Sequence, residues 1–390
     1  MLLVLSSGLM PLPGFCQDGS KMDLRDWLAE RGLEKARPMK NNFLFLLPVV
    51  GVNPSSGFIY GAGLTYAYQS KDGGARLSTI SSNASYSTKR LMNLNVKTNL
   101  FAFDNRLFLN GDWRYFVISE TTYGLGSSIT DTGQSLRYSL TRIHETVSFK
   151  LASNFFAGIG IHYDHQFHIA DNTVNEGDST QSYHYQYSVH HGFNPGHYIT
   201  AGYSLNLLFD NRDNPINAYK GCYININYRI DEKALGSSKS SSILLTEYRT
   251  FFSLDGEKHR HILALWLYGN YLISGNLPYL MLPAIGYDQR QKSGRGYPFG
   301  RFRGESLLYA ETEYRFPISN RTGILGGVVF CNLTSTSNQE EKIRLLEYAQ
   351  AAFGAGLRIM VDKMSRTRLQ LDGAIGNGKF ALYFGIRETF

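Results

Sequence analysis

The sequence predicts an all-β protein, a sixteen-stranded antiparallel transmembrane β-barrel preceded by a short N-terminal helix. Three observations lead to this prediction. The 390 residues are 14% aromatic, with 26 Tyr and 24 Phe, although the mean hydropathy is slightly negative at −0.23. From residue 43 onward, apolar and polar residues alternate with a period of two, as a strand with one side facing lipid and the other facing an aqueous lumen requires. The connections also alternate between short and long, as in barrels with tight periplasmic turns and long external loops.

The N-terminal region is predicted to precede the barrel. Residues 1–16 lie in an apolar stretch, MLLVLSSGLMPLPGFCQ, that is too short to span a bilayer as a helix. We interpret them as a signal peptide cleaved near Cys16; a lipid anchor there is a weaker alternative. Residues 17–42 are expected to form a periplasmic segment with one short amphipathic helix, whose capping box is Ser20 with Asp23.

Residues 43–390 are expected to form the barrel, with a strand in every apolar and polar alternating segment. An even number of strands places both ends of the barrel chain on the periplasmic side. The predicted strands begin near residues 43, 57, 74, 89, 105, 135, 154, 197, 219, 239, 258, 304, 321, 350, 366 and 379.

Two segments show the strand alternation clearly. In NRLFLNGDWRYF, Trp113 and Tyr115 alternate with Asp112 and Arg114. Charges on one side only are typical of a strand with one lipid-facing and one lumen-facing side. The C-terminal FALYFGIRETF follows the same rule. Its expected lipid-facing residues are Phe380, Leu382, Phe384, Ile386 and Phe390.

The connections separate into two sets. Short ones, KDGG, FDN, ASN, DGEKH, PISNR and DKMSR, are assigned to the periplasmic end. A soluble sandwich would have no reason to gather its long loops at one end, so this asymmetry favours an outer-membrane barrel. The long connections comprise residues 119–134, 170–196, 274–303 and 333–349.

Charge and composition exclude several function classes. The net charge is +7, but Lys and Arg are spread along the strands, so no nucleic acid is expected as a partner. The expected partners of this charge are the anionic headgroups of lipopolysaccharide or phospholipid. No nucleophile or isolated carboxylate pair indicates an enzyme, and no cofactor is expected. The inward charges are interpreted as a structural network in the lumen. They comprise Asp112, Glu247, Glu311, Asp372, Arg106, Arg114, Arg249, Arg366, Arg368 and Arg387.

Histidines are concentrated in one region of the sequence, with seven of the ten between residues 162 and 197. Imidazoles in an external loop can bind zinc or copper. No accompanying Cys or Glu pattern specifies a coordination geometry, so His184, His190, His191 and His197 are taken as solvated loop residues, and no metal site is assigned.

Three separated motifs resemble one family. GRGYPFGRFRG, residues 294–304, places arginines among glycines and aromatics; LLFDNRDNPINAYKG precedes the middle strands; and the last thirty-eight residues end on an aromatic residue. In this order they resemble the BamA and TamA surface-antigen superfamily of outer-membrane barrels. The resemblance implies that Arg295, Gly296 and Tyr297 form the tip of a loop that folds into the lumen. It also implies a periplasmic turn formed by Asp210, Arg212, Asp213, Asn214, Pro215 and Gly221.

The loop tip is expected to be held by a carboxylate. Strand alternation directs Glu311, Glu313 and Arg315 inward, and an Arg fork can bind a carboxylate with two parallel hydrogen bonds. The resemblance indicates Glu313 as the partner of Arg295. Glu311 and Asp372 are inward-facing alternatives.

The first and last strands are expected to form a weak lateral seam. Pro48 removes one ladder donor from the first strand, and Gly385 weakens the last strand, which ends at Phe390. In the family such a seam opens and pairs with an incoming strand. The alternative is that Pro48 only ends a short edge and Gly385 only relieves crowding.

By resemblance, the function is assembly or translocation of other proteins at the bacterial outer membrane. The alternatives are a channel or a lipid or solute transport barrel, and an adhesin acting through the long loops. Residues 17–42 leave no room for the POTRA domains of the family, so a separate periplasmic partner is expected to deliver client outer-membrane proteins. Three further departures from the family are Asn332 in place of Asp, Ala218 in place of a second turn Pro, and Glu388 in place of an apolar residue.

Overall fold

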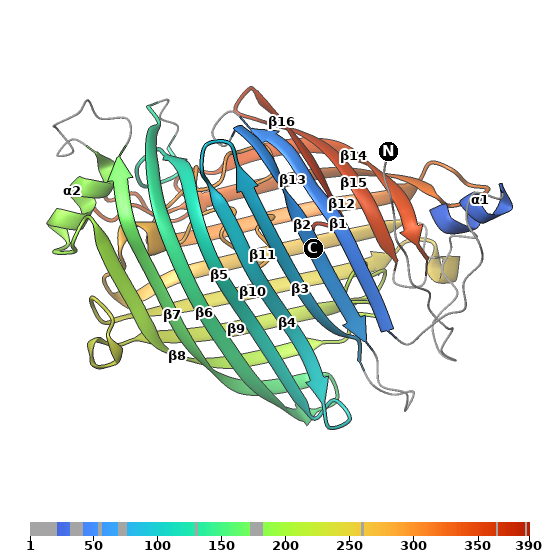
Figure 1. Ribbon diagram of the computed structural model, residues 1–390, viewed down its shortest axis with the longest axis horizontal. Helices are drawn as coiled ribbons and strands as arrows, with labels where there is room; N and C mark the ends of the chain where they lie inside the picture. Colours follow the sequence, from blue (N-terminus) through green and yellow to red (C-terminus); the bar gives the residue numbers. More distant parts are fainter. Residues whose placement is uncertain are drawn as a thin grey trace.

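The computed structural model describes residues 22–31, 42–53, 57–68, 76–128, 132–171, 182–258, 261–363, 366–386 and 388–390. Within these residues sixteen strands form one antiparallel sheet, in which each strand is hydrogen-bonded to its neighbours in the sequence. The chain is therefore the predicted all-β, sixteen-stranded barrel (Figure 1). The expected signal peptide, residues 1–16, and Ser20 lie outside the described residues.

The strand positions agree with the alternation in the sequence, because each strand begins within four residues of its predicted start. Short helices lie before β1 and between β7 and β8. The strands are β1 (Asn42–Asn53), β2 (Gly57–Tyr68), β3 (Ser78–Ser87), β4 (Met92–Ala102), β5 (Leu107–Thr122), β6 (Gln134–Ala152), β7 (Phe155–Asp171), β8 (His197–Asp210), β9 (Gly221–Asp231), β10 (Ser241–Ser253), β11 (Ile262–Gly275), β12 (Ser306–Pro317), β13 (Leu325–Thr336), β14 (Gln350–Asp362), β15 (Thr367–Gly376) and β16 (Lys379–Ile386). The α-helices are α1 (Leu24–Glu30) and α2 (Tyr183–His190).

Burial follows the alternation along the strands. Trp113 is 46% exposed on β5, whereas its neighbours Asp112 and Arg114 are buried. On β16, Phe380 and Phe384 are exposed, Phe384 by 75%. An apolar outer side and a charged inner side are what a strand between lipid and a polar lumen requires. Among the described helices, none is both long and apolar enough to cross a membrane.

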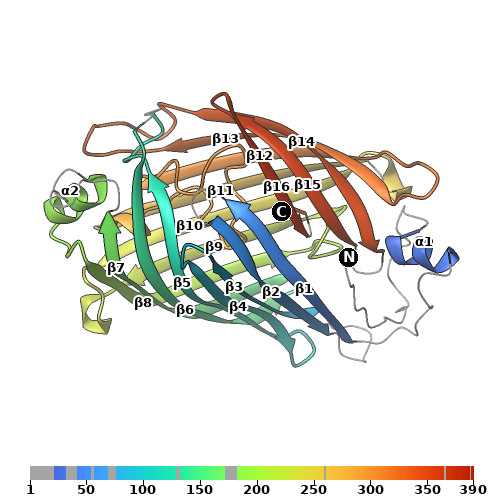
Figure 2. The ribbon, with the colours of Figure 1, turned by 45° about the horizontal axis from the view of Figure 1, so that its top comes forward.

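The two ends of the barrel differ. Figure 1 shows α2 and several of the longer connections at one end and α1 at the other. The α2 end carries the long connections β7–β8 and β11–β12, so it corresponds to the predicted external side. In Figure 2 the first strands, in blue, and the last strands, in red, both lie on the side facing the viewer. β1 and β16 are the two ends of the strand order.

The N-terminal helix is capped differently from the prediction. Asp23, not Ser20, caps α1: its Oδ1 accepts a hydrogen bond from Asp26 N at 2.8 Å, and Asp23 N donates to Asp26 Oδ2 at 3.2 Å. This reciprocal pair has the form of a capping box, with Asp at both positions. The spacing of three residues was correct, but the box begins three residues later.

The helix α1 lies against the periplasmic rim. Lys363, in the turn between β14 and β15, donates from its backbone N to Asp23 Oδ2 at 3.1 Å and from Nζ to Asp26 Oδ2 at 2.6 Å. Met22 N donates to Thr322 O, in the turn between β12 and β13, at 3.1 Å. These contacts join the segment before the barrel to the turns of its last third (Figure 1).

Candidate functional site

The connection between β11 and β12, residues 276–305, enters the barrel and is called the lumen loop below. Its base packs under α2, and its tip reaches the inner wall formed by β12 to β15. Near the base, Arg303 Nη2 bonds to Glu120 Oε1 on β5 at 3.0 Å, and Arg303 Nη1 bonds to Tyr279 O at 3.1 Å. Arg303 is fully buried, so its charge is compensated inside the protein rather than by water.

Arg295 lies at the centre of a carboxylate cluster. Its Nη1 donates to Asp372 Oδ2 at 2.8 Å, and its Nη2 donates to Glu311 Oε1 at 2.5 Å and also contacts the carboxylate of Glu313. All four side chains are at least 97% buried. Sequence reasoning named Glu313 with two alternatives, whereas the structure brings all three carboxylates to one guanidinium. The ring of Phe330 covers the group, with its centroid 3.4 Å from Cζ.

The glycines beside Arg295 allow this close approach. Gly296 has φ +99°, and a Cβ there would lie 2.6 Å from the Cβ of Ala352. The left-handed backbone and the nearby wall both exclude a side chain. Gly296 N donates to the hydroxyl of Tyr383 on β16 at 2.9 Å, and the Tyr297 hydroxyl donates to Ala351 O on β14 at 2.7 Å. The loop tip is therefore fastened to β14 and β16 as well as to β12.

The hydrogen bond of Asn332 explains why this chain has an asparagine where the family pattern has an aspartate. Its Nδ2 donates to the backbone carbonyl of Arg295 at 2.9 Å. An aspartate has no donor for this contact, so the amide allows β13 to hold the loop backbone. Sequence reasoning noted the substitution but had no signal for its partner.

The Arg295 cluster is part of a larger network that is balanced in charge. Four arginines, Arg295, Arg315, Arg358 and Arg368, face four carboxylates, Glu311, Glu313, Asp372 and Glu388. Such mutual compensation is needed wherever charges are buried. It supports the interpretation of the inward charges as a structural network.

Glu388 joins the C-terminus to this network. Arg358 Nε bonds to Glu388 Oε2 at 2.7 Å, and Arg315 Nε lies 3.9 Å from the same oxygen. Burial raises the pKa of Glu388, but Arg358 and Arg315 outweigh it and hold the pKa at about 2. Glu388, which stands where the family pattern has an apolar residue, thus has its charge compensated by arginines of the lumen wall.

Phe390 does not lie on the lipid-facing side, which corrects the prediction. β16 ends at Ile386, and Phe390 is 1% exposed, with its ring centroid 5.4 Å from that of Trp266. Its carbonyl accepts a hydrogen bond from Arg315 Nη2 at 3.2 Å. Inside the barrel, Glu388 binds Arg358, and Phe390 packs against Trp266. Phe390 is therefore part of the lumen core and not of the outer surface of the seam.

The other predicted lumen charges occupy several places. Asp112 pairs with Arg114 on β5, and Glu247 pairs with Arg249 on β10, so each pair joins residues two apart on the same strand. Arg106 is exposed in the turn before β5, so its assignment to the lumen is wrong: it precedes the first strand residue, where alternation no longer applies. Arg387 lies outside the described residues.

The predicted periplasmic turn lies between β8 and β9 and is built from side-chain caps. Asp210 binds Arg212 through two hydrogen bonds of 2.9 and 2.8 Å. Asp213 Oδ1 accepts from Tyr219 N at 3.0 Å, and its Oδ2 accepts from Arg366 Nη1 at 2.7 Å. Arg366 therefore ties this turn to the start of β15.

The remaining turn residues set its backbone. Asn214 Oδ1 accepts from Ile216 N and Asn217 N at 2.8 and 2.9 Å, which caps the bend around Pro215. Gly221 has φ +96°, and a Cβ there would lie 2.5 Å from Asn211 O. Only glycine fits this position without strain.

The two predicted seam residues lie on opposite sides of the wall. Pro48 is exposed in the middle of β1, opposite Ala62 of β2. A Cβ on Gly385 would lie 3.2 Å from Lys292 Nζ of the lumen loop and 3.3 Å from Gln370 Nε2. Gly385 therefore leaves room for the lumen loop beside β16.

Helix α2 forms a cap over the lumen loop. Ser182 Oγ accepts from Tyr185 N at 3.0 Å and so begins the helix. The Tyr187 hydroxyl bonds to Leu277 O at 3.1 Å, and the Tyr187 ring packs against Tyr279, with centroids 5.6 Å apart. His184 is buried in the same cluster, so the expectation of a solvated loop residue is wrong for this histidine, because the helix turns it toward Tyr279.

Acidification is expected to loosen the α2 cap. Burial, reinforced by Arg303, lowers the pKa of His184 from 6.5 to about 4, while Asp171 opposes the shift. The folded protein therefore binds fewer protons here than an unfolded loop. Stability from neutral His184 is complete above pH 6.5 and is lost as the pH falls toward 4, by up to about 3 kcal/mol. Limited proteolysis within residues 182–192, between neutral pH and pH 4, measures the loosening.

The matched variant for this measurement is His184→Gln, which keeps a polar group without the titration. Its cleavage rate should depend less on pH than that of the unchanged protein. If both proteins showed the same pH profile, the loosening would have to be assigned to another group.

Comparison with known proteins agrees with the barrel fold. Residues 75–390 match the family model of the Omp85 superfamily domain. No curated protein sequence matched the chain. The solved structure of BamA from Haemophilus ducreyi lacking POTRA domains 1–3 is similar, with 17% identity, a TM-score of 0.58, and coverage of 90% of this chain and 70% of that one.

Two further similar structures are CdiB from Acinetobacter baumannii and CdiB from Escherichia coli. Their identities are 12% and 10%, and their TM-scores are 0.53 and 0.55. The matches cover 89% and 90% of this chain but only 59% and 63% of the CdiB chains. At these identities the likeness concerns the fold, and the family model covers most of the chain. The chain is thus a bacterial outer-membrane β-barrel that belongs to the Omp85 superfamily.

Proposed function

We propose that this barrel assembles or translocates other proteins at the outer membrane, using the seam between β1 and β16 and the lumen loop held by Arg295. The observation that carries the proposal is the mismatch of the two terminal strands. β1 has twelve residues and β16 has eight. β16 can therefore pair with at most eight residues of β1, and part of the β1 edge is left for another strand.

The C-terminal segment supports this proposal. After Ile386 the chain leaves the wall, and Glu388, Thr389 and Phe390 are buried inside. Their position prevents β16 from continuing along β1. Pro48 also removes one N–H donor from the β1 ladder. The buried C-terminal residues and the missing donor both act on the two strands that border the seam.

The lumen network offers a link between the loop and the seam. Arg295 of the lumen loop shares Asp372 with Arg358, and Arg358 binds Glu388 directly after β16. Tyr383 on β16 holds the backbone of Gly296. A movement of β16 would therefore strain the contacts of the loop tip.

Photo-crosslinking in cells tests the proposal. A photoreactive amino acid is placed at Leu46 on β1 or Phe384 on β16, both exposed on the outer side. We expect crosslinks to strands of other outer-membrane proteins, identified by mass spectrometry. The control position is Leu205 on β8, which is 57% exposed and far from the seam in the strand order.

Each alternative function gives a different result. Crosslinks only between β1 and β16, or only to lipid, would contradict the assembly function and favour a channel or a lipid or solute transport barrel. Equal capture at Leu205 would show that the crosslinks reflect crowding in the membrane rather than a seam.

A further inference from the structure

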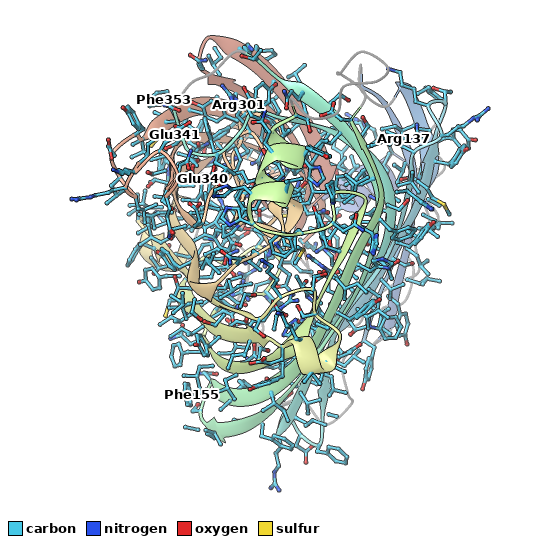
Figure 3. The ribbon with its side chains drawn as sticks, turned by 90° about the vertical axis from the view of Figure 1, so that its left-hand side faces the viewer. Arg137, Phe155, Arg301, Glu340, Glu341 and Phe353 are labelled. Carbon is cyan, nitrogen blue, oxygen red and sulfur yellow. The ribbon has the colours of Figure 1, made fainter. Side chains whose placement is uncertain are left out.

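Two external segments bring metal-binding side chains together. His190 and His191 stand at the C-terminal end of α2, and Glu340 lies in the connection between β13 and β14 (residues 337–349). Ligand atoms of the three side chains all lie within 4.8 Å of one another. His191 Nε2 is already 2.9 Å from Glu340 Oε1. Figure 3 shows Glu340 beside α2 at the end of the barrel.

Both segments are held in place independently of this contact. His191 N bonds to Tyr187 O at 2.9 Å, and its ring lies 4.1 Å from the Tyr187 ring, centroid to centroid. In the connection 337–349, Asn338 exchanges backbone bonds with Ile343 at 3.0 and 2.8 Å. Gln339 N donates to Glu305 Oε2 at 3.2 Å. The ligands are therefore positioned by two ordered backbones.

The chemistry of the three ligands selects a class of ion. Two imidazoles and one carboxylate are ligands that zinc accepts, with one position left for water. The C-terminal end of α2 carries negative partial charge, which favours a cation. Glu305 and Glu341 add carboxylates to the same region, which favours a cation. Lys239, whose ammonium group donates to the backbone carbonyl of His191, carries a positive charge that disfavours one.

We propose that His190, His191 and Glu340 form a binding site for a zinc-type divalent ion. The ion joins α2 to the connection 337–349 on the external side of the barrel. Since Tyr187 of α2 also packs against Tyr279 at the base of the lumen loop, the ion fastens the cap above that loop. His190 and Glu340 are exposed, so the ion reaches the site from outside the cell.

Isothermal titration of the purified full-length protein in detergent micelles with Zn²⁺ tests the proposal. We expect one ion per chain. The double variant His190→Gln/His191→Gln, and separately Glu340→Gln, should each weaken binding by at least about tenfold. Titration with Co²⁺ should give the visible absorption of a nitrogen- and oxygen-ligated ion in the unchanged protein, and this absorption should be weakened in both site variants.

The matched control removes two other exposed histidines, in the variant His168→Gln/His197→Gln. This pair lies near His165, whose ring centroid is 6.5 Å from that of His197. The control should bind Zn²⁺ as the unchanged protein does. Loss of binding in the control alone would move the site to these histidines and overturn the proposal, as would the absence of binding by the unchanged protein.

A second readout separates binding from folding. Zn²⁺ should slow proteolysis within residues 182–192 of the unchanged protein and of the control, because an ion that binds only the folded state stabilises it. In the His190→Gln/His191→Gln variant the rate should be the same with and without Zn²⁺. Protection of that variant by Zn²⁺ would contradict the site.

Discussion

Replacing Arg295 by alanine is expected to lower the free energy of unfolding by about 3–5 kcal/mol, because it removes one partner from a buried ion cluster. Glu311, Glu313 and Asp372 would lose a shared cation at positions where water does not reach them. The tip of the lumen loop would lose its contacts with β12 and β15 at the same time. Urea unfolding of the purified barrel, followed by the change in gel mobility of the folded form, measures the effect.

Two further variants make this result specific. Arg344→Ala removes an exposed arginine from another external connection and should leave stability nearly unchanged. Arg295→Lys keeps the charge, but one ammonium group cannot reproduce a guanidinium that contacts three carboxylates, so it should recover only part of the loss. An Arg295→Ala barrel as stable as the Arg344→Ala barrel would show that the cluster does not stabilise the fold.

Replacing Phe390 by alanine should cost a similar amount, about 3–5 kcal/mol, because it leaves a cavity in a packed core. The ring lies against Trp266 and Phe251, with centroid distances of 5.4 and 6.2 Å. Arg315 Cζ lies 5.5 Å from its centroid. The same unfolding measurement applies.

Phe384→Ala is the matched control, since it makes the same chemical change six residues earlier. Phe384 is 75% exposed on β16, where lipid or detergent fills the space and no cavity forms. Its cost should be clearly smaller than that of Phe390→Ala. If the order were reversed, Phe390 would belong on the outer side, as the alternation alone predicts.

The variants Arg295→Ala and Phe390→Ala also test how the parts of the site depend on one another. Glu313 contacts both Arg295 and Arg315, and Arg315 contacts the carbonyl of Phe390. Sites that share partners are not expected to be additive. The double variant Arg295→Ala/Phe390→Ala should therefore cost less or more than the sum of the single changes.

Local patterns in the sequence were sufficient for the strands and the loop lengths. A period of two follows from the pleat of a single strand, so it is present before any strand pairs with another. Gly296 was identified through the family resemblance, which implied that Arg295, Gly296 and Tyr297 form the tip of a loop inside the lumen. The inward direction of Glu311 and Glu313 follows from the same alternation.

Contacts across the lumen were not readable in this way. Asn332 and Tyr383 hold the loop tip from two different strands, and Arg358 on a third strand shares Asp372 with Arg295. Nothing in the local sequence of these residues indicates that they meet. Their roles depend on which residues meet inside the barrel. His184 is a similar case, since the chain around it is polar and its burial results from a helix packing on Tyr279.

By itself the sequence determined the class of fold, the number and order of the strands, and the family. These depend on properties repeated along the chain and on motifs that lie within one loop or turn. Only the tertiary structure decided that Arg295 meets three carboxylates, that Glu388 is paired, and that Phe390 turns into the lumen. Those outcomes depend on the compensation of buried charge between distant segments, and near the C-terminus it outweighs the alternation that directs a strand residue toward lipid.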